Sequence, residues 1–381
     1  MAGVLEALKR KERLKAEVRG LLSEREAAEA KRDHHALRPP RPCGLTVHTS
    51  IGCAYQCRYC YIYDMGFTSR VEPYPLTGLQ LVYALLENKY FIPGIGGTYL
   101  AFGSVTEPFH PAVKNRTFEY IEAVYKYLEN PVQFSTKAYI TKGDAEKLAR
   151  VSAGRVSPLI TIVSIEKSRE LEPHAPSPER RLEAMRNLKE AGLKPFLFLR
   201  PMIPGVVEAE YTRILDLAAE YGAVGVVAGA LRVTKRILEE LREAGVDIKE
   251  VVRRLKVPLE KMKPGVQYDV EMSDIKKKVA EYARRRGLVF FPSACMANLY
   301  THGLVCWKMV KMGFEARNLK KPEEGEVAEI LKAFGATTES VEFTGGELVV
   351  GVACKKCDVK LLSEVLRVEY KACARVFRST R

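Results

Sequence analysis

GCAYQCRYCY, residues 52–61, contains three cysteines within eight residues, Cys53, Cys57 and Cys60. An apolar run at residues 45–49 comes directly before it, and we expect a β-strand there. The three thiols would then lie on a loop at the carboxyl end of that strand, a usual place for an active site in parallel sheets. Cysteines crowded in this way are more typical of metal binding than of disulfides.

The number of cysteines suggests the kind of metal centre. Iron–sulfur clusters take thiolate ligands, and three local cysteines leave one iron of a four-iron cluster without a protein ligand. An open coordination position distinguishes catalytic metal centres from closed structural ones. A zinc knuckle or a plain electron-transfer cluster is the alternative, but the sequence offers no fourth ligand nearby.

Short apolar runs alternate with helical patterns from residue 45 to about residue 292, which is typical of a parallel βα array in an α/β protein. Right-handed crossovers would wind these units into an open barrel or curved sheet. The expected strands are 45–49, 99–103, 132–135, 159–164, 195–199, 224–229 and 288–291. The expected helices are 76–87, 113–127, 144–151, 178–191 and 209–221.

The pattern Cys-x3-Cys-x2-Cys, with aromatic Tyr59 before the third cysteine, resembles the radical S-adenosylmethionine (SAM) superfamily. The resemblance implies a partial (βα)6-type radical SAM barrel and a 4Fe-4S cluster on Cys53, Cys57 and Cys60. It implies that SAM binds the open iron and is cleaved reductively to a 5'-deoxyadenosyl radical. A reducing electron donor of the ferredoxin or flavodoxin type is implied as well.

Further stretches resemble the spore photoproduct lyase and DNA repair photolyase-like branch of that superfamily, from about residue 43 to residue 230. They are GSVTEPFHP at 103–111, STK at 135–137, SIE at 164–166, EPHAPSPERR at 172–181 and RPMIPG at 200–205. The resemblance implies that Thr106 and Glu107 lie near the amino group of SAM, Lys137 near its carboxylate and Ser164 near its ribose. Tyr59 is expected in the wall of the SAM pocket.

The stretch at 172–181 also has a plain local interpretation. Ser177 is expected to cap a helix with Pro178 at its first position, and Arg180 or Arg181 to fold back toward the site. One feature of the branch is absent, because residues 101–111 contain no cysteine. The lyase uses a cysteine there to return a hydrogen atom to its product, so the resemblance does not extend to that repair reaction.

Composition gives hints about partners and location. The formal net charge of +14 favours a polyanion such as DNA or RNA, although a generally basic solvated surface is the alternative. No stretch approaches the roughly 20 apolar residues of a membrane span, and the charged N-terminus does not resemble a secretory signal, so we expect a cytoplasmic protein with reduced thiols. Asn and Gln are scarce, at six and four residues, a bias found in thermophile proteins.

Three regions are expected. Residues 1–40 form an amphipathic charged helix, at about 4–31, followed by a linker that contains Pro39 and Pro40, and the helix either packs on the main domain or binds nucleic acid. Residues 41–306 form the radical SAM core. Residues 307–381 form a small α+β region with helices at 327–334 and 359–366, strands at 340–343 and 348–353, and a turn at 345–346.

The remaining cysteines offer a second possibility for metal. Cys354 and Cys357 form a Cys-x2-Cys pair, a common metal half-site, and Cys295, Cys306 and Cys373 could add ligands for an auxiliary cluster or a zinc ion. Inert buried thiols are the alternative. The segment 295–306 could instead line the substrate cavity and offer a thiol hydrogen donor.

The leading hypothesis is a radical SAM enzyme that acts on a nucleic-acid base or nucleotide. A second hypothesis keeps the chemistry but changes the substrate to a peptide, lipid or small metabolite. A third is a non-catalytic, metal-stabilised nucleic-acid-binding protein. A steep salt dependence of nucleic-acid binding separates the first hypothesis from the second, because counterion release follows the number of phosphate contacts.

Overall fold

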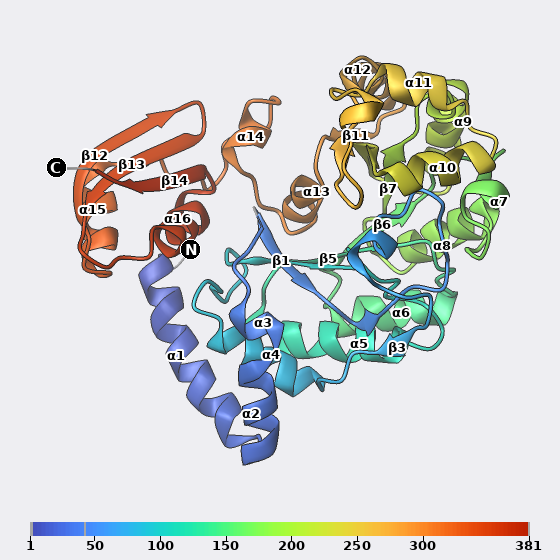
Figure 1. Cartoon of the computed structure of the whole chain (residues 1–381). Helices are drawn as coiled ribbons and strands as arrows, with labels where there is room; N and C mark the ends of the chain where they lie inside the picture. The colour runs from blue at the N-terminus through green and yellow to red at the C-terminus, as the bar shows by residue number, and fades with distance from the viewer. Residues whose placement is uncertain (1–2, 42, 380–381) are drawn as a thin grey trace.

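Seven parallel strands form the central sheet, and their order in space follows their order in the chain (Figure 1). The computed structural model describes residues 3–41 and 43–379, so residues 1, 2, 42, 380 and 381 lie outside the description. All seven expected strands are confirmed within a few residues at their ends. They are β1 (Gly44–Val47), β4 (Tyr99–Phe102), β5 (Val132–Thr136), β6 (Ser157–Thr161), β7 (Phe196–Met202), β8 (Gly225–Ala230) and β11 (Val289–Phe291).

These strands could be recognised because the sheet is buried on both faces. All five residues of β6 are buried, and so are five of the six residues of β8. Continuous apolar runs are typical of such strands, since helices cover a parallel sheet. The expected α/β barrel architecture is confirmed, with the sheet left open between β1 and β11.

Helices connect the strands, and Figure 1 shows α4, α5 and α6 along one side of the sheet. The expected crossover helices are present as α4 (Gly78–Glu87), α5 (Lys114–Ala123) with a π-helical turn at Val124–Leu128, α6 (Lys142–Val151), α8 (Pro178–Glu190) and α9 (Val207–Glu220). Three helices between β8 and β11 were not expected. They are α10 (Lys235–Glu243), α11 (Ile248–Arg253) and α12 (Ser273–Arg285).

Helix α13 (Ala294–Thr301) closes the interior of the barrel after β11. Its Asn298 and Thr301 side chains reach the starts of β5 and β6, where they contact the carbonyl of Pro131 and the hydroxyl of Ser157. Met296 and Leu299 join a buried cluster with residues of β6, β7, β8 and β11. The later residues of the helix therefore lie beside the amino ends of β5 and β6.

The N-terminal segment is not one helix, which corrects the expectation for residues 4–31. It forms α1 (Val4–Gly20), α2 (Glu24–Arg32) and the short α3 (His34–Leu37). Ser23 starts α2 with a capping box, in which its hydroxyl accepts from the Glu26 backbone while the Glu26 carboxylate accepts from the Ser23 backbone. This cap satisfies two terminal N–H groups and so favours a break over a continuous helix.

Residues of this segment pack on the rest of the protein. Val18 and Leu22 belong to the main core, and the Lys11 ammonium donates to the carbonyl of Asn88 at 2.6 Å. Val4 lies in a second core, formed mainly by the C-terminal region, and its backbone N–H donates to Glu369 at 2.6 Å. Packing on the main domain, one of the two expected alternatives, is what the structure shows.

The C-terminal region has its own three-stranded sheet and core. Its elements are α15 (Glu324–Lys332), β12 (Thr337–Thr344), β13 (Glu347–Ala353), α16 (Val359–Tyr370) and β14 (Cys373–Arg378). Strand β14 was not expected, because it is an edge strand in which a single residue, Val376, is buried. An edge strand with a single buried residue lacks the alternation of apolar and polar residues by which strands are recognised.

The remaining elements are short. They are β2 (Ser50–Ile51), Tyr63–Met65, β3 (Glu72–Pro73), α7 (Ser168–Leu171), β9 (Arg232–Val233), Leu259–Lys261, β10 (Tyr268–Asp269) and α14 (Trp307–Val310). None of the described helices is long and apolar enough to cross a membrane.

Candidate active site

The three clustered cysteines line one cavity of about 310 Å³. The loop that carries them leaves β1 and is held by the small β2–β3 ladder and by a hydrogen bond from the Cys53 N–H to the carbonyl of Thr68. Gly52 has a φ of +78°, and a Cβ there would lie 2.0 Å from the carbonyl oxygen of Arg70. Only glycine fits this position, so the turn requires a glycine directly before Cys53.

The rest of the cavity is built from the carboxyl ends of the strands. The lining residues include Phe102 from β4 and Gly103 directly after it, Gln133, Ser135 and Thr136 from β5, Thr161 from β6, Phe198 and Arg200 from β7 and Ala230 from β8. Parallel α/β folds place their ligand sites at this edge of the sheet.

Four of the five residues expected to contact SAM line this cavity, namely Tyr59, Thr106, Glu107 and Lys137. Ser164 does not, contrary to the expectation. Its hydroxyl donates to Glu210 at 2.6 Å and accepts from the Lys167 N–H at 2.9 Å. Both contacts organise the loop after β6, and they occupy the buried hydroxyl.

The side chain of Glu107 connects the loop after β4 to the end of β5. Its carboxylate accepts hydrogen bonds from the backbone N–H of Lys137 at 2.9 Å, from the backbone N–H of Phe109 at 3.2 Å and from the hydroxyl of Thr136. Burial nevertheless raises the pKa of Glu107 above its ordinary value, since these donors only partly offset the loss of water. The residue holds the loop that carries Lys137 beside the cysteines.

Lys137 places a buried cation beside the thiols. Its ammonium lies 5.5 Å from the centre of the Tyr59 ring. Burial alone would lower the pKa of Lys137, but the neighbouring Cys57 and Glu172 raise it above its ordinary value. The side chain therefore stays charged and can attract an anionic group in the cavity.

A buried ion pair between Glu172 and Arg181 lies next to Tyr59. The phenol of Tyr59 donates to Glu172, and Arg181 pairs with the same carboxylate at 2.5 Å. Arg181 also donates to the carbonyls of Pro176 and Thr161. Of the two arginines expected to fold back, Arg181 does so, whereas Arg180 packs over the ring of Tyr139 at the surface.

The beginning of α8 follows the local expectation. Ser177 occupies the N-cap position with extended backbone angles, and Pro178 follows at the start of the helix. The Ser177 side chain makes no capping hydrogen bond to the helix backbone. The main structural role of the stretch at 172–181 is therefore to turn the chain so that Arg181 and Glu172 form their ion pair.

Burial dominates the acidity of the thiols themselves. It raises the pKa of Cys53 to about 11 and that of Cys57 to about 12. The free thiols are therefore protonated at neutral pH, and metal binding would release protons from them. Backbone N–H groups of Tyr55 and Ile62 point at Cys53 and Cys60, as expected of donors that stabilise a thiolate.

Sequence patterns did not reveal the residues of α10 that hold the cysteine loop. Arg236 donates to the carbonyl of Cys60 at 2.5 Å and pairs with Asp64 at 2.8 Å. Glu240 pairs with Arg58 at 2.5 Å. These contacts join positions more than 170 residues apart, so no local spacing could have shown them.

Two buried polar atoms in the cavity lining have no hydrogen-bond partner among the described residues. They are the hydroxyl of Thr106 and the side-chain oxygen of Gln133. Buried polar atoms are rarely left unpaired, so these two mark places where a ligand group would bind. The lining thus offers three thiols, one cation and unpaired polar atoms in one space, which fits an iron–sulfur cluster together with a polar ligand such as SAM.

A second, basic cavity of about 580 Å³ adjoins the first. The two share Tyr61, Ser104, Val105, Arg200 and Arg232. The lining of the basic cavity includes four arginines, Arg38, Arg41, Arg200 and Arg232, and no acidic residue among those the structure describes. Within the same described residues, only Arg232 of the four is paired with a carboxylate, that of Asp269.

Three histidines, His34, His35 and His48, line this basic cavity, and two of them lie close to Asp33. Asp33, His34 and His35 have ligand atoms within 4.8 Å of one another. His35 is already bound on both sides, by Asp33 at 2.6 Å and by the backbone N–H of His48 at 3.1 Å, and Tyr74 donates to Asp33. These contacts tie α3 to β1 and the loop beyond it, and they leave His35 no free nitrogen for a metal.

Comparison with known proteins finds a family model that matches this part of the chain. The model described as the radical SAM superfamily matches residues 47–218. Residues 47–218 of the chain are therefore similar to a radical SAM domain.

Relatives of known sequence share this part of the chain. A protein of Methanocaldococcus jannaschii is 27% identical over 172 residues, which cover 43% of this chain and 62% of the relative. A protein of Mycobacterium tuberculosis H37Rv is 24% identical over 203 residues, which cover 50% of this chain and 59% of the relative. Both are named only as uncharacterised proteins, and the chain spans about 60% of their length.

Solved structures support the fold. A spore photoproduct lyase variant with bound SAM and dinucleoside spore photoproduct has a TM-score of 0.55 at 17% identity, covering 69% of this chain and 83% of that one. A second variant of the lyase has a TM-score of 0.54 at 17% identity, covering 71% and 86%. At this identity the likeness shows that the two proteins share a fold.

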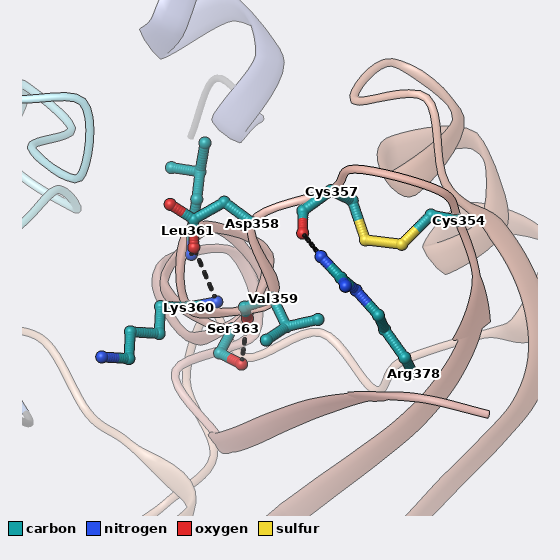
Figure 2. The surroundings of a disulfide bond; sticks show 8 residues. All are labelled: Cys354, Cys357, Asp358, Val359, Lys360, Leu361, Ser363 and Arg378. Carbon is teal, nitrogen blue, oxygen red and sulfur yellow. Dashed lines mark hydrogen bonds between the residues drawn. A yellow bond between two sulfur atoms is a disulfide. The ribbon is translucent and has the colours of Figure 1, made fainter. Parts of the chain in front are cut away.

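The C-terminal region also contains a bonded pair of cysteines. Cys354 and Cys357 form a disulfide bond between β13 and α16, with their Cα atoms 5.8 Å apart (Figure 2). Arg378 donates to the carbonyl of Cys357 at 2.7 Å. The bonded sulfurs differ from the expectation of reduced thiols throughout, and the metal half-site expected at this pair stays a prediction.

Proposed function

We propose that Cys53, Cys57 and Cys60 hold a 4Fe-4S cluster and that SAM binds beside it in the 310 Å³ cavity. The observation that carries the proposal is the convergence of three thiols, the Lys137 ammonium and two unpaired polar atoms at the carboxyl ends of the strands. When bound and reduced by a ferredoxin- or flavodoxin-type donor, the cluster supplies the electron that cleaves SAM into methionine and a 5'-deoxyadenosyl radical.

The chain's own residues would bind and orient SAM. Lys137 would bind the carboxylate of SAM, because its charge is buried and none of the hydrogen bonds found among the described residues occupies its ammonium. Glu107 would hold the backbone of Lys137 in place and present a carboxylate edge toward the amino group of SAM, with Thr106 beside it. Tyr59, fixed by Glu172, would form the wall behind the cluster. Ser164 is left out of this site, since its hydroxyl contacts Glu210 and Lys167 instead.

For the substrate, we propose a nucleic-acid base or nucleotide. The basic cavity shares five lining residues with the proposed SAM cavity, and its arginines would bind phosphate groups. Tyr61 and Phe67 line the same space and offer aromatic rings on which a base could stack. The net charge of +14 agrees with a polyanionic partner.

Two other functions make different predictions. A radical SAM enzyme for a peptide, lipid or small metabolite would bind DNA and RNA no more tightly than its net charge requires. A non-catalytic, metal-stabilised binding protein would bind nucleic acid but not SAM. The unpaired Thr106 and Gln133 atoms beside the cysteines favour a catalytic cavity over such a closed metal site.

SAM binding at the cluster tests the proposal. The protein is purified without oxygen, supplied with iron and sulfide and reduced with dithionite, and its electron paramagnetic resonance spectrum is recorded with and without SAM. We expect SAM to change the spectrum of the wild type and of a Cys354→Ser/Cys357→Ser control, and to leave that of Cys57→Ala unchanged. A wild-type spectrum that does not respond to saturating SAM would refute the site.

A further inference from the structure

Four other cysteines meet in a cavity of about 550 Å³ between the barrel and the C-terminal region. They are Cys43, Cys295, Cys306 and Cys373. Cys43 precedes β1, Cys295 lies in the first turn of α13, Cys306 precedes α14 and Cys373 begins β14. Four separate segments thus each bring one thiol to the same space, and none of the four cysteines is part of a disulfide.

The four thiols are close neighbours. Those of Cys43 and Cys295 are within hydrogen-bonding reach of each other. Cys306 lies within electrostatic range of Cys43, Cys295 and Cys373. Scattered inert cysteines would have no reason to gather around one cavity, since a buried thiol packs equally well elsewhere in a core.

The surroundings suit thiolates. The sulfur of Cys306 accepts hydrogen bonds from the backbone N–H groups of Lys308 and Met309. The Lys308 ammonium reaches the sulfur of Cys373, and Arg367 lies beside Cys43. Backbone donors and cations of this kind stabilise the negative charge of metal-bound sulfur.

We propose that Cys43, Cys295, Cys306 and Cys373 ligate a second iron–sulfur cluster, of the 4Fe-4S type. Four cysteines would give every iron a protein ligand, so this cluster is closed, unlike the one proposed at Cys53, Cys57 and Cys60. The inference goes beyond the proposed function, which needs only the first cluster.

The spacing of the sulfurs favours a cluster over a zinc ion. Four sulfurs at about 2.3 Å from one tetrahedral zinc lie roughly 3.8 Å from one another. Among the described residues, no three of these thiols lie within 4.8 Å of one another, and the same holds for Cys53, Cys57 and Cys60. In a 4Fe-4S cluster each thiolate binds a different iron, which allows the wider spacing.

The position of the second cavity gives the cluster two consequences. Ala294 lines the catalytic cavity, whereas its neighbour Cys295 lines the second one, so the start of α13 is the wall between them. The cluster would also join β1 and α13 of the barrel to β14 of the C-terminal region. Because such a site exists only when the chain is folded, cluster binding would stabilise the contact between the two regions.

Iron content separates the two clusters. We would reconstitute the full chain and its Cys53→Ala/Cys57→Ala/Cys60→Ala variant without oxygen and measure iron, acid-labile sulfide, zinc and the visible absorption. We expect about eight irons in the wild type and about four in the triple variant, with a spectrum that does not respond to SAM. Adding Cys306→Ser and Cys373→Ser should remove the remaining iron, whereas adding Cys354→Ser and Cys357→Ser should not.

Other outcomes have clear meanings. A triple variant that contains no iron, or one zinc in its place, would overturn the second cluster and leave the first intact. A triple variant that keeps all the wild-type iron would instead refute the first site. If the double serine change prevents folding, Cys43→Ser in the triple variant is expected to alter the paramagnetic resonance spectrum of the reduced cluster, and an unaltered spectrum would count against the proposal.

Discussion

The carboxylate of Glu172 and the guanidinium of Arg181 form an ion pair at 2.5 Å, and 0% and 1% of the two side chains are exposed. The phenol of Tyr59, one residue before Cys60, donates to the same carboxylate. The backbone N–H of Arg58 donates to the carbonyl of Leu171, next to Glu172. The segment after β6 therefore holds the cysteine loop through the side chain of Tyr59 and the backbone of Arg58.

Loss of Arg181 should strongly destabilise the protein. Arg181→Met leaves the Glu172 carboxylate buried without its cation, and we expect the free energy of unfolding to fall by about 3–5 kcal/mol. Arg180→Met, at the exposed neighbouring position, should cost less than about 1 kcal/mol. Denaturant titrations of both variants check this, and equal losses would contradict a special role for the buried pair.

The double variant Glu172→Gln/Arg181→Met should be more stable than Arg181→Met alone. Removing the carboxylate charge together with its partner removes the unpaired buried ion, which is the main cost of the single change. The same denaturant titrations measure the difference. An additive loss in the double variant would mean that the two residues act independently.

Lys137→Met should weaken SAM binding while the cluster remains. Removing a charge-assisted hydrogen bond costs about 1.5–3 kcal/mol, so the Kd for SAM should rise about ten- to a hundredfold. Equilibrium dialysis with reconstituted protein gives the Kd, and iron analysis gives the cluster content. Lys147→Met is the control, because its ammonium lies over Phe118 away from the cavity lining. An unchanged Kd would remove Lys137 from the SAM site.

Nucleic-acid binding should depend on the arginines of the basic cavity. Arg38→Ala and Arg200→Ala should each lower the affinity for single-stranded DNA or RNA and reduce the slope of log affinity against log salt by about 0.7 for each phosphate that the variant no longer binds. Arg317→Ala, at an exposed position outside the cavity lining, is the control. Fluorescence anisotropy at several salt concentrations measures the slope. Equal effects at all three positions would indicate binding by net charge alone.

Two partly buried histidines, His34 and His48, predict an acid-sensitive fold. Burial lowers the pKa of His48 to about 3, and burial together with His35 lowers that of His34 to about 4. An unfolded histidine titrates near pH 6.5, so the unfolded chain binds more protons below that pH and stability falls as the pH drops from about 6.5 toward 4.

The His48→Phe variant isolates one of these groups. The variant keeps a ring against Tyr74 and His34 but removes one proton-binding site. We expect its unfolding free energy to fall less than that of the wild type between pH 7 and pH 5, as measured by denaturant titration. His174→Phe, at an exposed position, is the control. Identical pH slopes for wild type and His48→Phe would contradict the burial argument.

Much of the barrel could be predicted from the sequence, because a buried parallel strand such as β8 is a continuous apolar run. The break between α1 and α2 was missed, since the capping box at Ser23 competes with an otherwise regular helical pattern. Helix α10 was missed as well, although its residues Arg236 and Glu240 hold the cysteine loop.

Site residues were predictable only where they lie close together in the chain or follow a strand. Cys53, Cys57 and Cys60 are local, and Lys137 follows β5 directly. By contrast, Cys43 and Cys373 are 330 positions apart and meet only through the folded arrangement of β1 and β14. The spacing of Cys354 and Cys357 in the sequence showed that the two lie close together, but it did not indicate the bond between their sulfurs.

The measurement that tests the central claim most directly is the formation of 5'-deoxyadenosine. Anaerobically reconstituted protein is reduced with dithionite in the presence of SAM, and the products are separated by chromatography, with Cys57→Ala and Cys354→Ser/Cys357→Ser in parallel. The account predicts 5'-deoxyadenosine from the wild type and the double serine variant and none from Cys57→Ala. A wild type that carries an intact cluster yet forms no 5'-deoxyadenosine, with DNA and RNA present, would contradict it.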